Sequence, residues 1–244
     1  MARNQNARAL SRTMLDVIAD AMAILREDAS EYAFIGLAGG ASAGIAVLLL
    51  GIIAWPVAIA CIGPALLLIA ATTLATSSAA VGTGVNRLQP DAARAFAEAA
   101  RRGGAVLRPW LPLAVVLGAA SFVAATLATH MGPVPPGAVV LTLAALSAIY
   151  ALPRSLFSTA MFEYDLSIDE ALTASSAVVR MMTRSAAMAW CIVLAPGILV
   201  LMLGAISGID IVTGAVAAVL VVGAMPAGAA LMSRLFREAA TSAR

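Results

Sequence analysis

Six apolar segments, each close to the length of a membrane-spanning helix, dominate this sequence. A helix needs about 20 apolar residues to cross the bilayer's hydrocarbon core, which is about 30 Å thick. Only 11% of the 244 residues are charged, against roughly a quarter in an ordinary soluble domain, and 62% are hydrophobic. We therefore predict an all-α fold, a polytopic membrane bundle. The expected six transmembrane helices cover residues 33–55, 57–80, 110–130, 137–157, 186–207 and 211–232.

The distribution of basic residues predicts how these spans are oriented. All 15 basic residues are Arg, and none lies in the short connections after the first, third and fifth spans. Because loops that carry basic residues remain in the cytoplasm, both termini and both longer connections are expected inside a bacterial-type inner membrane. The expected division is a cytoplasmic segment 1–32, a membrane domain 33–233 and a cytoplasmic tail 234–244. Residues 1–32 carry several acids and no long apolar run, so they do not resemble a signal peptide.

Three cytoplasmic segments have the pattern of amphipathic helices. Apolar residues recur on one face from Leu10 to Leu25, opposite charged ones. A second segment opens at Asp91. In the third, Ser167 and Glu170 have the spacing of a capping box, which predicts a helix start near Ile168.

The order of amphipathic helix, span, short turn and span would occur three times. The second and third units align at an offset of 78 residues, and whether this is a threefold internal repeat stays open. The matched pairs are Leu88 with Leu166, Asp91 with Asp169, Ala93 with Ala171, Ala99 with Ala177 and Arg102 with Arg180.

Glycines form a stripe along the first expected span. Gly36, Gly40 and Gly44 lie four residues apart, and Gly51 lies close to the same stripe. Small residues at this spacing let a second helix approach closely, so we interpret the stripe as a packing surface. A pore or a lipid-facing groove is the alternative. The partner helix, in this chain or in another copy, is not specified by the pattern.

The densest basic patch lies between the second and third spans. It consists of Arg94, Arg101, Arg102 and Arg108. Near an anionic inner leaflet such residues attract lipid headgroups, and the alternative is simple anchoring of the topology. Nucleic-acid binding is not expected, because acids are interleaved and no stacking aromatics accompany the patch.

Arg154 is expected near the inner end of the fourth span, directly after Pro153. An ionisable residue at this depth is a candidate functional residue, although one at a helix end usually extends to the headgroups. We expect Arg154 to reach the headgroups or to pair with Glu163 or Asp165.

No residue pattern predicts catalysis, a cofactor or a metal ion. His130 is the only histidine, and no Cys, Asp or Glu lies near it in the sequence. Cys61 and Cys191 lie inside apolar segments and are interpreted as small buried apolar residues. With no clustered carboxylates in the spans, a membrane-embedded enzyme is the least favoured class.

The segment from Glu163 to Ser175, followed by Arg180 and an apolar segment, resembles bacterial six-span proteins of the glycerophosphoryl diester phosphodiesterase membrane-domain type and their uncharacterised relatives. The segment from Ile62 to Leu67 and the connection with Arg101 and Arg102 are also similar. In the phosphodiesterases the chemistry belongs to a separate soluble barrel, for which this chain has no room. The resemblance therefore implies a membrane module and transfers no catalytic residue.

Two functions remain after these exclusions. The first is a non-enzymatic membrane module that organises anionic lipids or partner proteins, or assembles with copies of itself, through its Arg-bearing cytoplasmic face. The second is a small transporter or permease subunit for a neutral or lipidic substrate, since Pro64, Pro196 and Pro226 interrupt spans. The polar run from Thr72 to Ser78 is the one stretch expected to line a cavity, unless its hydroxyls bond back to their own helix.

Overall fold

The computed structural model describes residues 14–53, 55–85, 91–131, 149–191, 193, 199, 203 and 211–242. Every regular element in these ranges is a helix, which confirms the all-α class. Three helices are long and apolar enough to cross a membrane, over Ala29–Leu50, Ala60–Thr83 and Ile211–Thr241. These coincide with the first, second and sixth expected spans.

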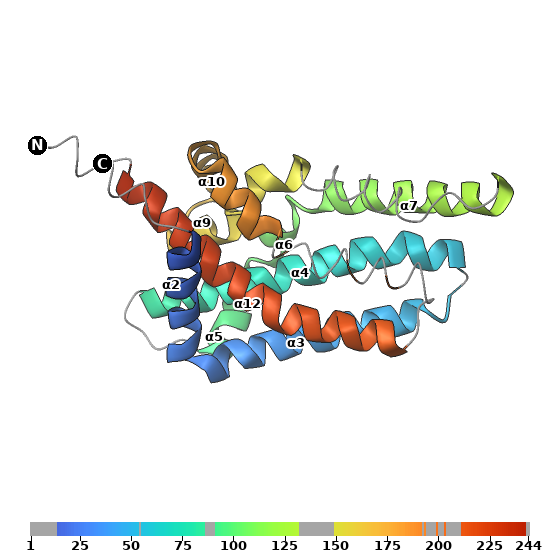
Figure 1. Ribbon diagram of the computed structural model, residues 1–244, viewed down its shortest axis with the longest axis horizontal. Coiled ribbons are helices and arrows are strands. Elements are labelled where there is room, and N and C mark those ends of the chain that lie inside the picture. The colour runs from blue at the N-terminus through green and yellow to red at the C-terminus, as the bar shows by residue number, and fades with distance from the viewer. Residues whose placement is uncertain are drawn as a thin grey trace, which may run out of the picture.

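Four long helices run along the longest axis of the molecule (Figure 1). They are α3 (Ala29–Leu50), α4 (Trp55–Val85), α7 (Leu111–Met131) and α12 (Ile211–Ser242). Helix α3 packs most extensively on α12, and α4 lies against α3, α7 and α12. Helix α7 coincides with the third expected span. Most of the fourth and fifth expected spans lies outside the described residues.

Two of the long helices extend further than their apolar segments. Helix α4 continues to Val85, and α12 continues to Ser242 through most of the expected tail. The interior proline of each, Pro64 and Pro226, is accommodated within the continuous helix. In α12 the last turns carry Arg234 and Arg237, whereas the first part of the helix is apolar. The end of the bundle where these arginines lie is called the charged end below.

Large apolar side chains cover the outside of the long helices. Phe34 and Leu49 on α3, Val115 on α7 and Val219 on α12 are each more than half exposed. In water, an apolar surface of this extent promotes association, whereas in lipid it is the normal outer face of a bundle. The exposed surface therefore agrees with the length and hydropathy of the candidate spans.

Short helices gather at one end of the long ones (Figure 1). Helix α2 (Met14–Glu27) crosses this end and contacts α12, while α5 (Ala92–Arg101) and α6 (Gly103–Leu107) lie against α4. The 3₁₀ turn η1 (Leu152–Arg154), α9 (Phe157–Glu163) and α10 (Ile168–Met181) follow in the chain.

The starts of the short helices follow from local hydrogen bonding. Asp91 caps α5 by accepting from the backbone N–H groups of Ala93 at 2.9 Å and Arg94 at 3.3 Å. Helix α10 begins at Ile168, where Glu170 accepts the Ser167 N–H at 3.0 Å, so the predicted helix start is confirmed. The two caps are Asp91 and Ser167, which are 76 residues apart (167 − 91) and not 78. The threefold repeat therefore remains a hypothesis.

Candidate functional site

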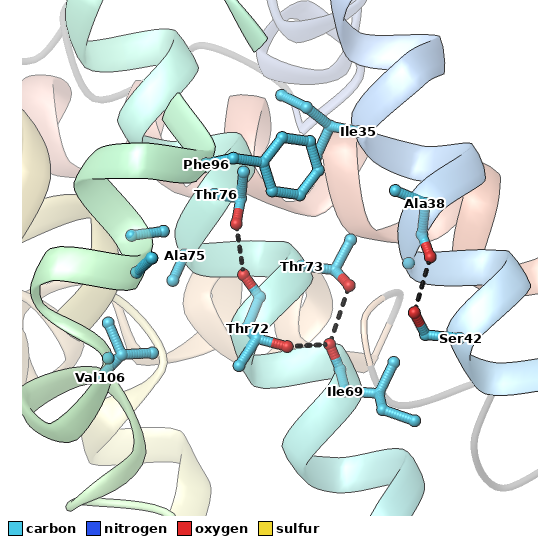
Figure 2. A pocket seen from close by; sticks show the side chains of 14 residues that line it. Ile35, Ala38, Ser42, Ile69, Thr72, Thr73, Ala75, Thr76, Phe96 and Val106 are labelled. Carbon is cyan, nitrogen blue, oxygen red and sulfur yellow. Dashed lines mark hydrogen bonds between the residues drawn. The ribbon is translucent and has the colours of Figure 1, made fainter. Parts of the chain in front are cut away.

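A cavity of about 330 Å³ lies between α3 and α4 and is bordered by α5 and α6. Figure 2 shows the Phe96 ring beside Ile35 and Thr76 at its upper end. Ser42 of α3, Thr72 of α4 and Ala100 of α5 are exposed cavity residues, so the cavity opens to the outside of the bundle. The volume is at the small end of the range of about 300–1,000 Å³ for ligand pockets.

The hydroxyl groups around the cavity are bonded to their own helices. Thr73 donates to the Ile69 carbonyl at 2.8 Å, Thr76 to the Thr72 carbonyl at 2.9 Å and Ser42 to the Ala38 carbonyl at 2.8 Å (Figure 2). A hydroxyl held in this way has its only proton engaged, so it offers a ligand acceptor lone pairs and no donor. Three threonines of the predicted polar run do line a cavity, but its surface is largely apolar in character.

Close packing on two sides positions this cavity. A Cβ atom at Gly39 would lie 2.3 Å from Thr73 Oγ1, so the glycine allows α3 to approach α4 there. On α5, Phe96 meets the exposed Phe34 of α3 edge-on, with ring centroids 6.2 Å apart. The Glu31 carboxylate also accepts the Ala92 N–H at 2.8 Å, which fixes the start of α5 to α3.

Three of the glycines in the predicted stripe face α12. Cβ atoms would lie 2.4 Å from the Val222 carbonyl oxygen at Gly36 and 2.6 Å from the Ala218 carbonyl oxygen at Gly40. At Gly44 the nearest atom would be the Gly214 carbonyl oxygen at 3.2 Å. Gly51 instead caps the end of α3 and is exposed.

Two neighbouring arginines of the basic patch are engaged within the chain. Arg101 donates twice to Glu98, from Nε at 3.0 Å and Nη2 at 2.7 Å. Arg102 also contacts Glu98, with Nε 2.7 Å from Oε1, donates from Nη1 to the Met161 carbonyl at 3.2 Å and pairs through Nη2 with Asp165. The hydrogen bond from Arg101 holds the pKa of Glu98 below its usual value, and that from Arg102 does the same for Asp165. Arg102 is therefore mainly a link between α5 and the turn after α9.

The other basic candidates lie elsewhere on the surface. Arg94 and Arg108 are exposed, and no ion pair to either occurs among the described residues. Arg154 donates from Nη1 to the Tyr150 carbonyl at 2.7 Å, and its guanidinium carbon lies 3.9 Å from the Tyr150 ring centroid.

The expected pairing of Arg154 with Glu163 or Asp165 does not occur in the structure. Both carboxylates are paired with arginines that come from distant parts of the chain, namely Arg237 and Arg102. These partners are 74 and 63 residues away from their acids.

A buried ion pair, which the sequence did not predict, joins α9 to α12. Glu163 Oε2 accepts from Arg237 Nε at 3.3 Å and Nη2 at 3.2 Å, and the Glu163 side chain is only 2% exposed. Its other carboxylate oxygen has no hydrogen-bond partner within the described part of the chain. Burial raises the pKa of Glu163, while the nearby Ser233 hydroxyl and Arg237 oppose this shift. In the sequence, Glu163 and Arg237 each lie at the end of an apolar run. This placement does not indicate that the two residues pair.

The cysteines do not lie where the sequence analysis placed them. Both Cys61 and Cys191 are free and exposed on helix surfaces, so their interpretation as buried residues was wrong. Apolar neighbours in the sequence did not indicate burial, because apolar side chains cover the outside of this bundle as well as its core. Within the described ranges, no group of three or more His, Cys, Asp or Glu side chains comes together to bind a metal ion.

Comparisons of this chain with models of protein families, with curated proteins and with solved structures found no match. The resemblance to the phosphodiesterase membrane domain therefore remains an expectation from the sequence.

Proposed function

We propose that this chain is a six-span, multi-pass protein of the inner membrane that binds membrane lipid in the cavity between α3 and α4 and catalyses no reaction. The observation that carries the proposal is the cavity wall, which combines an apolar lining with hydroxyl groups that are already bonded to their own helices. Such a wall suits a hydrocarbon chain better than a polar solute, because a solute's hydrogen-bond acceptors would lose water without gaining a donor from these hydroxyls.

The proposed topology has both termini in the cytoplasm. Its support is the absence of Arg from three of the connections, together with the gathering of α2, α5, α9 and α10 at one end of the long helices (Figure 1). That end carries the Arg102–Asp165 and Arg237–Glu163 pairs. A charged end of this kind fits the cytoplasmic boundary, where basic residues accumulate.

The position of the cavity is also suited to lipid. Ser42 and Thr72, which are exposed at its edge, belong to α3 and α4, two of the helices able to cross a membrane. In that orientation the opening faces acyl chains, and a chain could enter sideways without passing through water. A neutral or lipidic transport substrate remains the second function, because the same opening would serve it.

Photo-crosslinking tests the proposal directly. The purified protein is reconstituted with phosphatidylcholine whose acyl chain carries a diazirine, illuminated, and mapped by mass spectrometry. Labelling is expected at cavity residues such as Ser42 and Thr72, and filling the cavity by Ala100→Phe should reduce that labelling several-fold.

The matched control is Ala93→Phe. Ala93 is exposed on the same helix but does not line the cavity, so this variant should label as the wild type does. Labelling confined to the outer surface, for example at Val115 and Val116, would contradict the proposal. Equal labelling of the two Phe variants would also contradict it.

A further inference from the structure

Tyr150 links the Arg154 side chain to the backbone beside Arg108. Its hydroxyl donates to the Pro109 carbonyl at 3.0 Å, directly after Arg108. Arg154 lies over the same ring, with its guanidinium carbon 3.9 Å from the centroid, and donates to the Tyr150 carbonyl. One aromatic ring and one hydrogen bond therefore separate the Arg154 guanidinium from the backbone next to Arg108.

The backbone that carries Arg154 is held firmly. The Ser175 hydroxyl of α10 donates to the Pro153 carbonyl at 2.9 Å and accepts the Leu156 N–H at 3.1 Å. These two hydrogen bonds clamp the turn η1 from both sides. The Arg154 side chain is thus positioned by its own backbone, by an aromatic ring and by a carbonyl, with no acid involved.

Donors exceed acceptors around this place. Each guanidinium has five N–H donors and no acceptor, and one bond from Arg154 to a carbonyl leaves most of them unused. The nearest acids along these segments, Glu98 and Glu163, are bound to Arg101 and Arg237.

The adjoining aromatic side chains are buried and pack on one another. Trp110, two residues after Arg108, stacks on Trp190 with ring centroids 5.5 Å apart. Neither indole N–H has an acceptor within the described part of the chain. Positive charge and unused donors without an acid are the composition of an anion site, and arginine binds phosphate in a two-pronged geometry.

The two arginines also share a depth in the proposed topology. Arg108 precedes α7, the third expected span, and Arg154 closes the fourth, so both lie at the cytoplasmic boundary. Trp110 and Tyr150 are the residue types that concentrate at that boundary.

We propose that Arg108 and Arg154 bind the phosphate of an anionic phospholipid headgroup. This inference rests on the membrane placement given under Proposed function and is independent of the acyl-chain cavity. Arg101 and Arg102, the pair at the centre of the basic patch, take no part, because their donors serve Glu98 and Asp165.

The test measures lipid retention by native mass spectrometry. The protein is extracted from nanodiscs that hold equal parts phosphatidylglycerol and phosphatidylcholine with the same acyl chains. The wild type is expected to retain phosphatidylglycerol preferentially, and each of Arg108→Gln and Arg154→Gln to reduce this preference about fivefold. Arg154→Lys keeps the charge but loses the planar fork, so it should recover the preference in part.

Arg94→Gln is the matched control, since Arg94 is exposed as Arg108 is, but belongs to α5. A preference that persists in Arg108→Gln, or that Arg94→Gln reduces as strongly, would overturn the proposal. Arg108 is exposed, so its variant keeps the test valid if Arg154→Gln fails to fold.

Two additional arms separate the sources of the phosphate and the two proposals. Inorganic phosphate in excess should not displace the lipid, and displacement by that excess would assign the site to a soluble phosphate instead. Ala100→Phe should keep the headgroup preference although it loses acyl-chain labelling. In the wild type, a headgroup preference without acyl-chain labelling of the cavity would overturn the cavity proposal alone, and labelling without the preference would overturn the headgroup proposal alone.

Discussion

Arg237 donates two hydrogen bonds to a single oxygen of the Glu163 carboxylate, and leaves the second oxygen buried and without a partner in the described part of the chain. Helices α9 and α12 are thereby joined at the charged end of the bundle. A buried carboxylate with one unused oxygen accepts a proton more readily than an exposed one, because protonation removes a poorly solvated charge.

Replacing Glu163 by Gln is expected to change the pH dependence of stability. The pKa of Glu163 is raised above its ordinary value of about 4.5, so the folded state binds this proton more tightly than the unfolded state. The resulting stability is fully present below the ordinary pKa and is lost as pH rises through the raised one. Glu163→Gln has no carboxyl group to titrate, so its stability should not fall over this pH range. Melting temperatures in detergent over a pH series measure the difference.

Glu98→Gln provides a contrast with the opposite sign. The hydrogen bond from Arg101 lowers the pKa of Glu98, so its contribution is present above the ordinary pKa and is lost as pH falls through the lowered one. Glu98→Gln should therefore flatten the acid side of the profile of melting temperature against pH.

Identical pH profiles for the wild type and Glu163→Gln would show that Glu163 does not titrate differently on folding.

Gly36→Ala is expected to separate α3 from α12. The added Cβ would lie 2.4 Å from the Val222 carbonyl oxygen, and backbone atoms on both sides have to move to admit it. Overpacking of this kind costs about 1–3 kcal/mol, measurable as unfolding in denaturing detergent. Gly223→Ala, one residue from the same contact, has open space for its Cβ and should stabilise α12 by about 0.5–1 kcal/mol. Equal effects of the two variants would argue against close packing here.

Arg102→Gln is expected to lower the melting temperature more than Arg101→Gln does. Arg102 joins α5 to the Met161 carbonyl and to Asp165, whereas the contacts of Arg101 stay within its own helix. Asp165 is the only described residue other than glycine with a positive φ, at 51°, so the link also holds an unusual turn. Thermal unfolding of both variants in the same detergent checks the order. A larger effect of Arg101→Gln would contradict it.

Single cysteines test the six-span topology. After Cys61 and Cys191 are replaced by Ser, a cysteine at Gly132 or Gly208 should react with an impermeant maleimide added to whole cells. One at Ala99 or Ala177 should react only after the membrane is opened. A reversed pattern at any of these positions would exclude the proposed orientation.

Local patterns predicted the local parts of the structure. The Ser167 and Glu170 spacing located the start of α10, because both groups of a capping box lie within one turn. The glycine stripe likewise indicated a close approach along α3. It did not specify the partner, since Gly214 and Ala218 on α12 are one of several small-residue pairs at this spacing, as Ala71 and Ala75 on α4 also are.

The contacts that organise the charged end depend on distant residues. Arg102 meets Asp165, and Arg237 meets Glu163, only after the intervening helices have packed. Nothing in the spacing of these residues distinguishes the two pairings from others, such as that of Arg154 with Glu163. The cavity was foreseen in its threonines but not in its other walls, because Phe96 and Ala100 reach it through the position of α5.

The contact between α3 and α12 joins the earliest described long helix of the chain to the latest one. During synthesis, α3 enters the bilayer long before residues 211–242 leave the ribosome. The face with Gly36, Gly40 and Gly44 therefore has no α12 to pack against during this time. Until α12 arrives, that face is open to any other small-residue helix in the same membrane. The bundle therefore becomes resistant to wrong pairing only when translation has finished, and nascent chains that stop before α12 should be the first to reach the membrane proteases.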